Sequence, residues 1–280
     1  MWERRSATAG RSASPSGIAG GIASGTPTCA AGCWLAKTGS LPAQLPIEVD
    51  DGDGLLAAAL GQLDDGADLV KLYMDGPDRD TSPFTASEVR QTVEAVHARG
   101  ATVTAHSSLL PGARAAVAAG VDALEHGFQL DADLAAAMAA QGTALVATLA
   151  VMHSWGTFAT TTRLPRFASA AGRAVLAERR ETAHESVRLA DAAGVLIAAG
   201  TDFGGGSLRA NQLAWEVQAL VAAGLDPYDA LAAATVNGGR LLGEPQAGVL
   251  AQGGPADFLL VHGDPLSEPG SLWRVWRTSW

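Results

Sequence analysis

The sequence predicts an α/β protein built on a parallel β-sheet, and two observations carry this prediction. Short apolar strands recur near residues 69, 102, 122, 143 and 195, and helical segments lie between them. Such repeated strand-helix units are typical of parallel sheets covered by helices. They fit either an open, doubly wound sheet or a (β/α)8 barrel. Because no G-x-G-x-x-G turn follows a first strand, a dinucleotide-binding site is not expected.

Composition narrows the class of protein further. The chain has 280 residues, 48% of them apolar and 17% charged, which suffices for one barrel-sized core. A net charge of −10 disfavours nucleic-acid binding. No apolar run is long enough to span a membrane. Two cysteines, Cys29 and Cys33, cannot build a disulfide framework, so we expect a cytoplasmic protein.

The elements can be justified in chain order. Residues 1–44 are rich in Ser, Gly, Ala, Thr and Arg without a hydrophobic period, so we expect an irregular, disordered or non-native segment. A helix should end at Gly66 before the strand at 69. Thr85 and Glu88 form a capping-box pattern, which predicts a helix up to Gly100.

Later elements follow the same alternation. We expect a strand over 143–151, a long helix over 170–193, and one helix over 226–243 that begins after Asp226. The stretch before the long helix is expected to be a loop. Its arginines, Arg163 and Arg166, could meet a substrate carboxylate.

Polar side chains recur at or near the ends of the apolar strands. Lys71 lies in the strand DLVKLYM, His106 ends ATVTAH, His126 ends VDALEH, and Asp202 follows VLIAAGT. Each residue alone could be a packing or turn residue. In a parallel barrel, however, the carboxyl ends of the strands converge on one face, and that face holds the active site. The joint pattern therefore predicts one site.

These residue types suit a divalent metal. Neutral imidazoles and carboxylates bind zinc and similar ions. Burial favours the neutral lysine amine, which could take up carbon dioxide and become an anionic carbamate ligand. Asp202 could bind the metal or accept a proton from water. Lys71 could instead form a Schiff base with a carbonyl substrate, which is a metal-free alternative.

The motifs resemble those of a known family. VKLYMDG, TAHS, LEHG and AAGTDFG are similar to the fourth, fifth, sixth and eighth strand motifs of the metal-dependent amidohydrolase superfamily, in its imidazolonepropionase-like and prolidase-like branch. AATVNGGRLLG and GVLAQGGPADFLLVHGDPL resemble the end of that barrel and its return into a small β-sandwich. The resemblance spans about residues 50–270.

The resemblance implies a fold and a set of roles. Residues 45–243 would form a TIM-like (β/α)8 barrel, and residues 244–280 would add strands of a C-terminal β-sandwich. Lys71 would be the N-carboxylated lysine, and His106 and His126 would be metal ligands. Asp202 would contact the metal and shuttle protons. One or two ions, expected to be Zn²⁺, would activate water to hydrolyse a C–N bond, as in an amide or a cyclic amide.

Further expectations concern the substrate and its binding residues. Tyr73 points the same way as Lys71 in a strand of period two, and His153 follows the expected strand over 143–151. Both are candidate substrate-binding residues. We expect a small-molecule substrate of the amide or dipeptide-like class, with neither a nucleic-acid nor a membrane partner.

One family motif is missing. None of the six histidines forms the H-x-H pair that the family places at the end of barrel strand one. The barrel would therefore be incomplete, truncated at its N-terminal side, with strands one to about three missing or replaced. Weak or no activity is then expected, and the alternative function is an inactive remnant or a binding protein. Exposed sheet edges would favour a homo-oligomer.

Overall fold

The structure, a computed structural model, describes residues 32–279. The expectations for residues 1–31, Cys29 included, lie outside this range. The described chain divides between Glu125 and His126 into two compact units. Seven strands form one sheet in the order β2-β1-β3-β4-β5-β6-β7. The predicted α/β class with a parallel sheet is confirmed.

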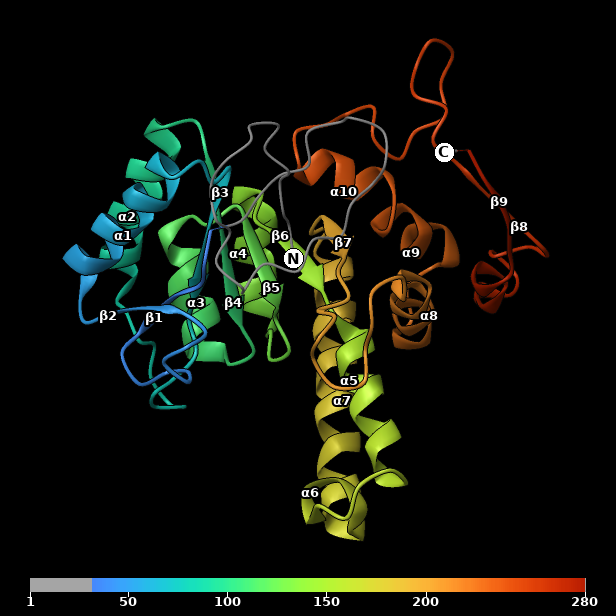
Figure 1. Ribbon diagram of the computed structural model, residues 1–280, viewed down its shortest axis with the longest axis horizontal. Coiled ribbons are helices and arrows are strands. Elements are labelled where there is room, and N and C mark those ends of the chain that lie inside the picture. The colour runs from blue at the N-terminus through green and yellow to red at the C-terminus, as the bar shows by residue number, and fades with distance from the viewer. Residues whose placement is uncertain (1–31, 280) are drawn as a thin grey trace. The chain divides into compact units, whose positions relative to one another are not determined.

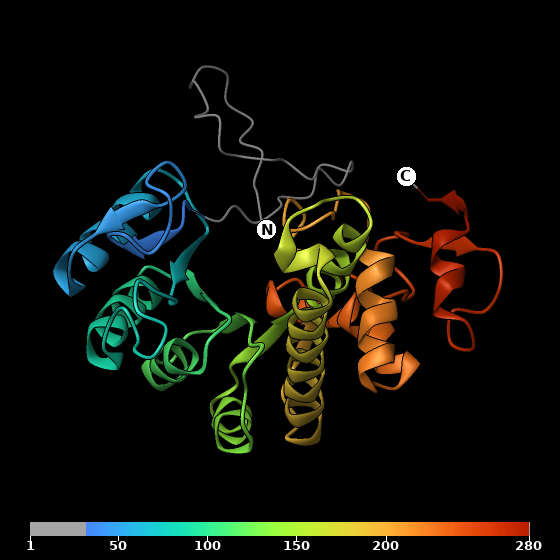
Figure 2. The ribbon, with the colours of Figure 1, turned by 90° about the horizontal axis from the view of Figure 1, so that it is seen from below.

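The first unit alternates strands and helices. Its elements are β1 (Leu35–Lys37), β2 (Ile47–Val49), α1 (Gly52–Asp64), β3 (Leu69–Tyr73), α2 (Ala86–Ala98), β4 (Thr102–Ser107), α3 (Leu110–Ala119) and most of β5 (Ala123–His126). β1 pairs in parallel with both β2 and β3, and β3 pairs in parallel with β4. Helices α1, α2 and α3 pack side by side along these strands (Figures 1 and 2).

The sequence signals of this unit act as expected. Thr85 caps α2, and its backbone N–H donates to Glu88 in return, so the capping box is complete. Val89, Val93 and Val96 form the buried face of this helix. The five strands expected from the pattern correspond to β3, β4, β5, β6 and β7.

β1 corrects the expectation for the N-terminal segment. It falls inside the stretch expected to be irregular, and it pairs with the lysine strand β3 on the side away from β4. Leu35 and Ala36 are fully buried there. Three residues are too short to produce a visible hydrophobic period, which is why the pattern missed this strand.

The second unit combines a helical hairpin with a short C-terminal sheet. Its elements are α4 (Ala132–Gln141), β6 (Ala144–Ala147), α5 (Leu149–Gly156), η1 (Thr157–Ala159), α6 (Pro165–Ala168), α7 (Ala170–Ala192), β7 (Ile197–Ala199), α8 (Leu213–Ala223), α9 (Pro227–Ala233), α10 (Val236–Leu241), β8 (Leu259–Val261), η2 (Pro269–Trp273) and β9 (Val275–Thr278). β6 and β7 pair in parallel. Helices α5 and α7 pack together as a hairpin with α6 at its end (Figure 1).

Three expected elements differ in this unit. The strand expected over 143–151 ends at Ala147, and α5 begins at Leu149, because an apolar run does not distinguish a strand from a buried helix. The stretch before the long helix contains η1 and α6 rather than loop alone. The helix expected over 226–243 breaks at Thr235 into α9 and α10.

The C-terminal strands β8 and β9 form a two-stranded antiparallel sheet within the stretch expected to join a β-sandwich. None of the described helices combines the length and apolar composition that a bilayer span requires.

Candidate functional site

Lys71 lies in the middle of β3 and is buried. Its Nζ forms an ion pair with the carboxylate of Glu125 on β5, which is buried as well. The hydroxyl of Thr104 donates to the other Glu125 oxygen at 3.0 Å. The ammonium group also lies 5.4 Å from the ring centre of Trp34. In this structure Lys71 is therefore a paired cation.

His106 ends β4 and is held by a carboxylate at the end of the neighbouring strand. Its Nε2 lies 3.1 Å from Oδ2 of Asp75, which follows β3. Asp75 also accepts bonds from the Ser107 hydroxyl and from the backbone N–H groups of Ser108 and Leu109. Burial raises the pKa of Asp75, but the hydrogen bonds and the His106 charge outweigh it and leave the pKa below its usual value.

Tyr73 lies opposite His106 in the parallel register of β3 and β4. The two rings stack with their centres 4.1 Å apart. Burial, with the Asp75 charge second, raises the pKa of Tyr73 to about 12, so its phenol stays protonated. Tyr73 therefore packs on the imidazole with its phenol protonated.

His126 ends β5 and belongs to the second unit. It is buried, and its Nδ1 lies 2.7 Å from the hydroxyl oxygen of Thr148, the residue that follows β6. Its backbone is left-handed, with φ of 72°. Asp202, three residues beyond β7, also has a left-handed φ, of 48°.

These backbones distinguish the predicted residues from the rest of the chain. Within residues 32–279 three non-glycine residues have such a φ, and His126 and Asp202 are two of them. The conformation costs about 1–2 kcal/mol for a residue with a β-carbon. Strained backbones of this kind gather at functional sites, which is an independent reason to consider both residues.

His153 differs from its expected place. It lies in the last turn of α5, where its Nε2 is 3.1 Å from Nε2 of His184 on α7. Burial, followed by the charges of His184 and Arg180, lowers the pKa of His153 to about 4. A neutral pair of stacked imidazoles is a packing arrangement, so the expectation that His153 follows a strand directly is wrong.

No group of three or more His, Cys, Asp or Glu side chains is arranged to hold a metal ion within the part of the chain that the structure describes. The first unit brings together Lys71 and Glu125, and separately His106, Asp75 and Tyr73. The second brings His126 to Thr148.

Sequence reasoning missed Asp75, Glu125, Thr148 and Glu216. Asp75 and Glu125 could have been predicted as site residues, because each is an acidic residue close to a predicted site residue at a strand end. Glu216 could not have been: it lies within the first turns of α8 and looks like an ordinary helix residue.

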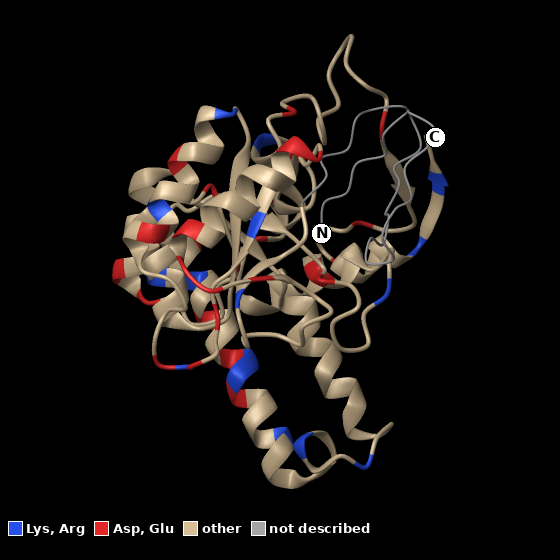
Figure 3. Ribbon diagram, turned by 60° about the vertical axis from the view of Figure 1, so that its left-hand side comes forward, with Lys and Arg blue, Asp and Glu red and all other residues tan. Residues whose placement is uncertain are grey.

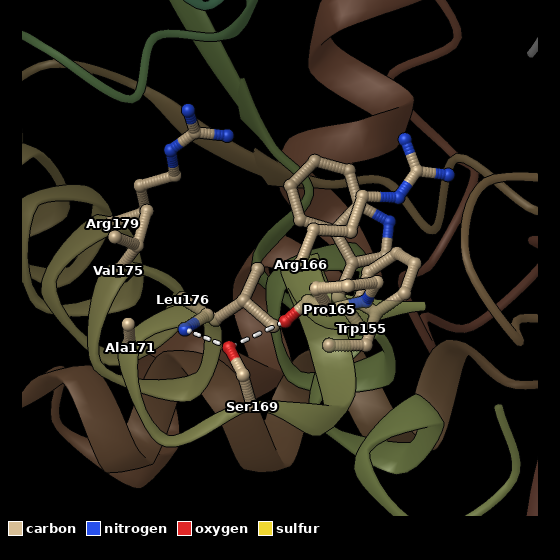
Figure 4. Close-up of a pocket in the computed structure, with 10 residues that line it drawn as sticks. Trp155, Pro165, Arg166, Ser169, Ala171, Val175, Leu176 and Arg179 are labelled. Atoms are coloured by element: carbon tan, nitrogen blue, oxygen red, sulfur yellow. Dashed lines mark hydrogen bonds between the residues drawn. The ribbon is translucent and has the colours of Figure 1, made fainter. Parts of the chain in front are cut away.

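A pocket of about 680 Å³ lies in the helical hairpin of the second unit, lined by Trp155, Pro165, Arg166, Phe167, Ser169, Ala171, Gly172, Val175, Leu176 and Arg179 (Figure 4). Its wall is mainly apolar, with two guanidinium groups. The Arg166 guanidinium lies 4.8 Å from the ring centre of Phe167. Arginines on α6 and the first half of α7 make this end of the hairpin basic, in a chain with a net charge of −10 (Figure 3).

The pocket adjoins the loop that carries Asp202. A β-carbon added at Gly206 would lie 2.7 Å from Cδ1 of Trp155, so the loop packs directly on this pocket residue. The backbone N–H of Ser207 also donates a hydrogen bond of 3.2 Å to the hydroxyl of Ser154 on α5. The loop after β7 therefore packs on α5.

Comparison with known proteins identifies the family. Residues 60–276 match the amidohydrolase family. The chain belongs to the amidohydrolase family. This confirms the resemblance drawn from its strand-end motifs, and such enzymes generally use divalent metals.

Three relatives show the extent of the similarity. An uncharacterized protein of Mycobacterium tuberculosis is 35% identical over 254 residues, which cover 86% of this chain and 64% of the relative. Ochratoxinase of Aspergillus niger is 30% identical over 247 residues, covering 83% and 50%. A solved Xaa-Pro dipeptidase with bound methionine aligns with a TM-score of 0.73 and 26% identity, over 88% of this chain and 65% of that one. The chain thus spans about two thirds or less of these relatives.

Proposed function

We propose that the chain is a metal-dependent hydrolase of C–N bonds in small amides, with His106, His126 and Asp202 as its candidate metal ligands. The left-handed backbones of His126 and Asp202 carry this proposal. Strained residues gather at functional sites, and these two lie at or just beyond the ends of separate strands in a chain of the amidohydrolase family. A divalent ion, proposed to be Zn²⁺, would act as a Lewis acid and lower the pKa of water towards about 7.

The two histidines suit metal ligation because each ring has one nitrogen held by an oxygen. Asp75 faces Nε2 of His106, and Thr148 faces Nδ1 of His126. Such partners fix the tautomer and orientation of a ligating imidazole. We therefore propose both imidazoles as metal ligands.

Lys71 fits less directly. Its amine is paired with Glu125, and a protonated amine cannot ligate a cation. For Lys71 to become a carbamate, its ammonium group would have to add carbon dioxide and release two protons, and Glu125 would lose its partner. We propose that a bound divalent ion would offset the negative charges that this leaves, and that the Lys71–Glu125 pair neutralises both groups in the metal-free protein.

Asp202 acts as the proton carrier in this proposal. Water adds to the amide carbonyl carbon and gives a proton to the Asp202 carboxylate. The C–N bond then breaks, and the amine leaves with that proton. The products are a carboxylic acid and an amine, so atoms and charges balance.

The substrate class follows from the pocket beside the Asp202 loop. Arg166 and Arg179 offer charge-assisted bonds to a carboxylate, and Trp155 offers an aromatic wall. We propose N-acyl amino acids and dipeptide-like amides as substrates, in keeping with the names of the Xaa-Pro dipeptidase and ochratoxinase relatives.

The test measures bound metal and hydrolysis on the same preparations. Zinc content is determined by elemental mass spectrometry, and release of free amino acid is followed from a panel of N-acyl amino acids. His126→Asn and Asp202→Asn are the test variants. His262→Asn is the matched control, because His262 lies in the C-terminal segment beside Trp276.

We expect about one zinc per chain in the parent protein and in His262→Asn, with zinc lost in His126→Asn. Hydrolysis should fall at least 100-fold in Asp202→Asn. A parent protein that binds no zinc would overturn the proposal and favour an inactive remnant or a binding protein. Equal zinc content in parent and His126→Asn would overturn the assignment of that ligand.

A further inference from the structure

Thr148 occupies the N-cap position of α5 but does not cap it. A threonine at this position ordinarily accepts a bond from a backbone N–H in the first turn of the helix. The Thr148 side chain makes no such bond. Its hydroxyl lies instead 2.7 Å from Nδ1 of His126, and both side chains are buried.

A carboxyl group from another helix replaces the missing cap. Glu216 on α8 accepts the N–H of Leu149 at 3.0 Å with Oε1 and the N–H of Ala150 at 2.6 Å with Oε2. The Glu216 side chain and both backbone donors are in fully buried residues. Burying an acidic side chain is unfavourable, so an ordinary solvent-exposed cap would begin this helix at a lower free-energy cost.

The two observations explain each other. The first-turn N–H groups of α5 are buried and need acceptors. If Thr148 supplied one, its hydroxyl would have to turn away from His126. Because Glu216 satisfies two of these donors, the Thr148 hydroxyl is released from capping and stays on the imidazole.

We propose that Glu216 is a positioning residue for His126: it caps α5 in place of Thr148 and so keeps the Thr148 hydroxyl on Nδ1 of His126, which fixes the orientation of that imidazole. This inference rests on the proposed function only in making His126 a ligand. Glu216 itself touches neither metal nor substrate.

The test is a nitrogen-15 NMR measurement of the His126 side chain in the metal-free protein. The resonances are assigned by their loss in His126→Gln. Glu216→Gln leaves one backbone donor without an acceptor and should draw the Thr148 hydroxyl into the cap. Thr148→Val removes the hydroxyl at nearly constant shape, and Thr148→Ser retains it. Val217→Ala, at the next residue of α8, removes buried apolar contact without touching the cap.

We expect Glu216→Gln and Thr148→Val to shift the His126 nitrogen resonances, with Thr148→Ser and Val217→Ala close to the parent. The double variant should match Thr148→Val alone, because both changes act through the same hydroxyl. Zinc dissociation constants should rise about 10-fold to 100-fold in Glu216→Gln and Thr148→Val, the usual effect of losing a partner of a metal ligand.

Unchanged His126 resonances in a folded Glu216→Gln protein would overturn the proposal, as would equal shifts in Val217→Ala. If Glu216→Gln does not fold, the comparison of Thr148→Val with Thr148→Ser still decides whether the hydroxyl holds His126, and identical spectra would overturn the proposal. A parent protein that binds no zinc while these resonances respond as expected would sink the proposed function and leave the positioning role standing.

Discussion

At the scale of single residues, the first unit places opposite charges together in its interior. Lys71 is 6% exposed and Glu125 is 7% exposed, on strands either side of β4. Such a pair gains little net stability, because the attraction is offset by the loss of hydration of two ions. Removing one partner is a different matter, since it leaves a buried charge alone.

The Lys71–Glu125 pair therefore predicts a non-additive result. Lys71→Met alone should destabilise the metal-free protein by about 3–5 kcal/mol, and Lys71→Met with Glu125→Leu should cost much less than the two single changes together. Urea unfolding measures each free energy. Costs that simply add would contradict the pairing.

His153 makes stability depend on acid. Burial lowers the pKa of His153 in the folded chain to about 4, against its ordinary value of 6.5. The folded state therefore binds fewer protons between these values, so the contribution of His153 is complete above pH 6.5 and is lost as pH falls towards 4. Melting temperatures from pH 4 to 7 should drop less steeply in His153→Gln than in the parent protein. An identical slope in both would refute this, and His262→Gln is the control.

At the scale of elements, α3 depends on a close backbone approach. A β-carbon at Gly112 would lie 1.9 Å from the carbonyl oxygen of Met74, just beyond β3. Backbone atoms cannot move aside cheaply, so Gly112→Ala should displace the helix and destabilise the chain by about 1–3 kcal/mol.

Gly61, inside α1, is the matched control. A β-carbon there would meet nothing within 4 Å. Gly61→Ala should therefore stabilise the chain by about 0.5–1 kcal/mol through helix propensity. Thermal unfolding of both variants distinguishes the cases, and equal effects would rule out the close approach.

The cap of α5 predicts the opposite pH dependence from His153. Complete burial raises the pKa of Glu216 to about 8 from its ordinary 4.5, although two backbone N–H groups work against this. The folded state then binds more protons between these values, so stability should fall as pH rises from 4.5 to 8. Glu216→Gln should flatten this part of the stability profile measured by urea unfolding. A profile that falls equally in the variant would contradict the shift.

How far the sequence predicts this structure depends on how local each signal is. The capping box at Thr85 and the strand that ends in His126 are written in neighbouring residues, and both were predictable. β1 was not, because three residues show no period. Asp75 and Glu216 act on residues 31 and 66 or more positions away, and only the fold brings them there.

At the scale of the whole molecule, family membership favours a metal site, whereas the missing H-x-H pair limits how many metal ions the chain can bind. The amidohydrolase match covers residues 60–276, so it includes the strands of Lys71, His106 and His126 and the loop of Asp202. The sequence contains no H-x-H pair, so the proposed residues offer ligands for one metal ion but too few for a second. A site with few protein ligands should bind a single ion reversibly.

Reversible binding predicts a stability that follows free zinc. A ligand that binds only the folded chain at about 100 times its dissociation constant adds about 2.7 kcal/mol, which corresponds to a rise in melting temperature of roughly 5–10 °C for a chain of this size. We expect this rise in the parent protein and its reversal by a chelator. His106→Asn should melt at one temperature with and without zinc, while His262→Asn should behave as the parent does. A zinc-dependent rise of the same size in His106→Asn would mean that the ion binds elsewhere on the chain.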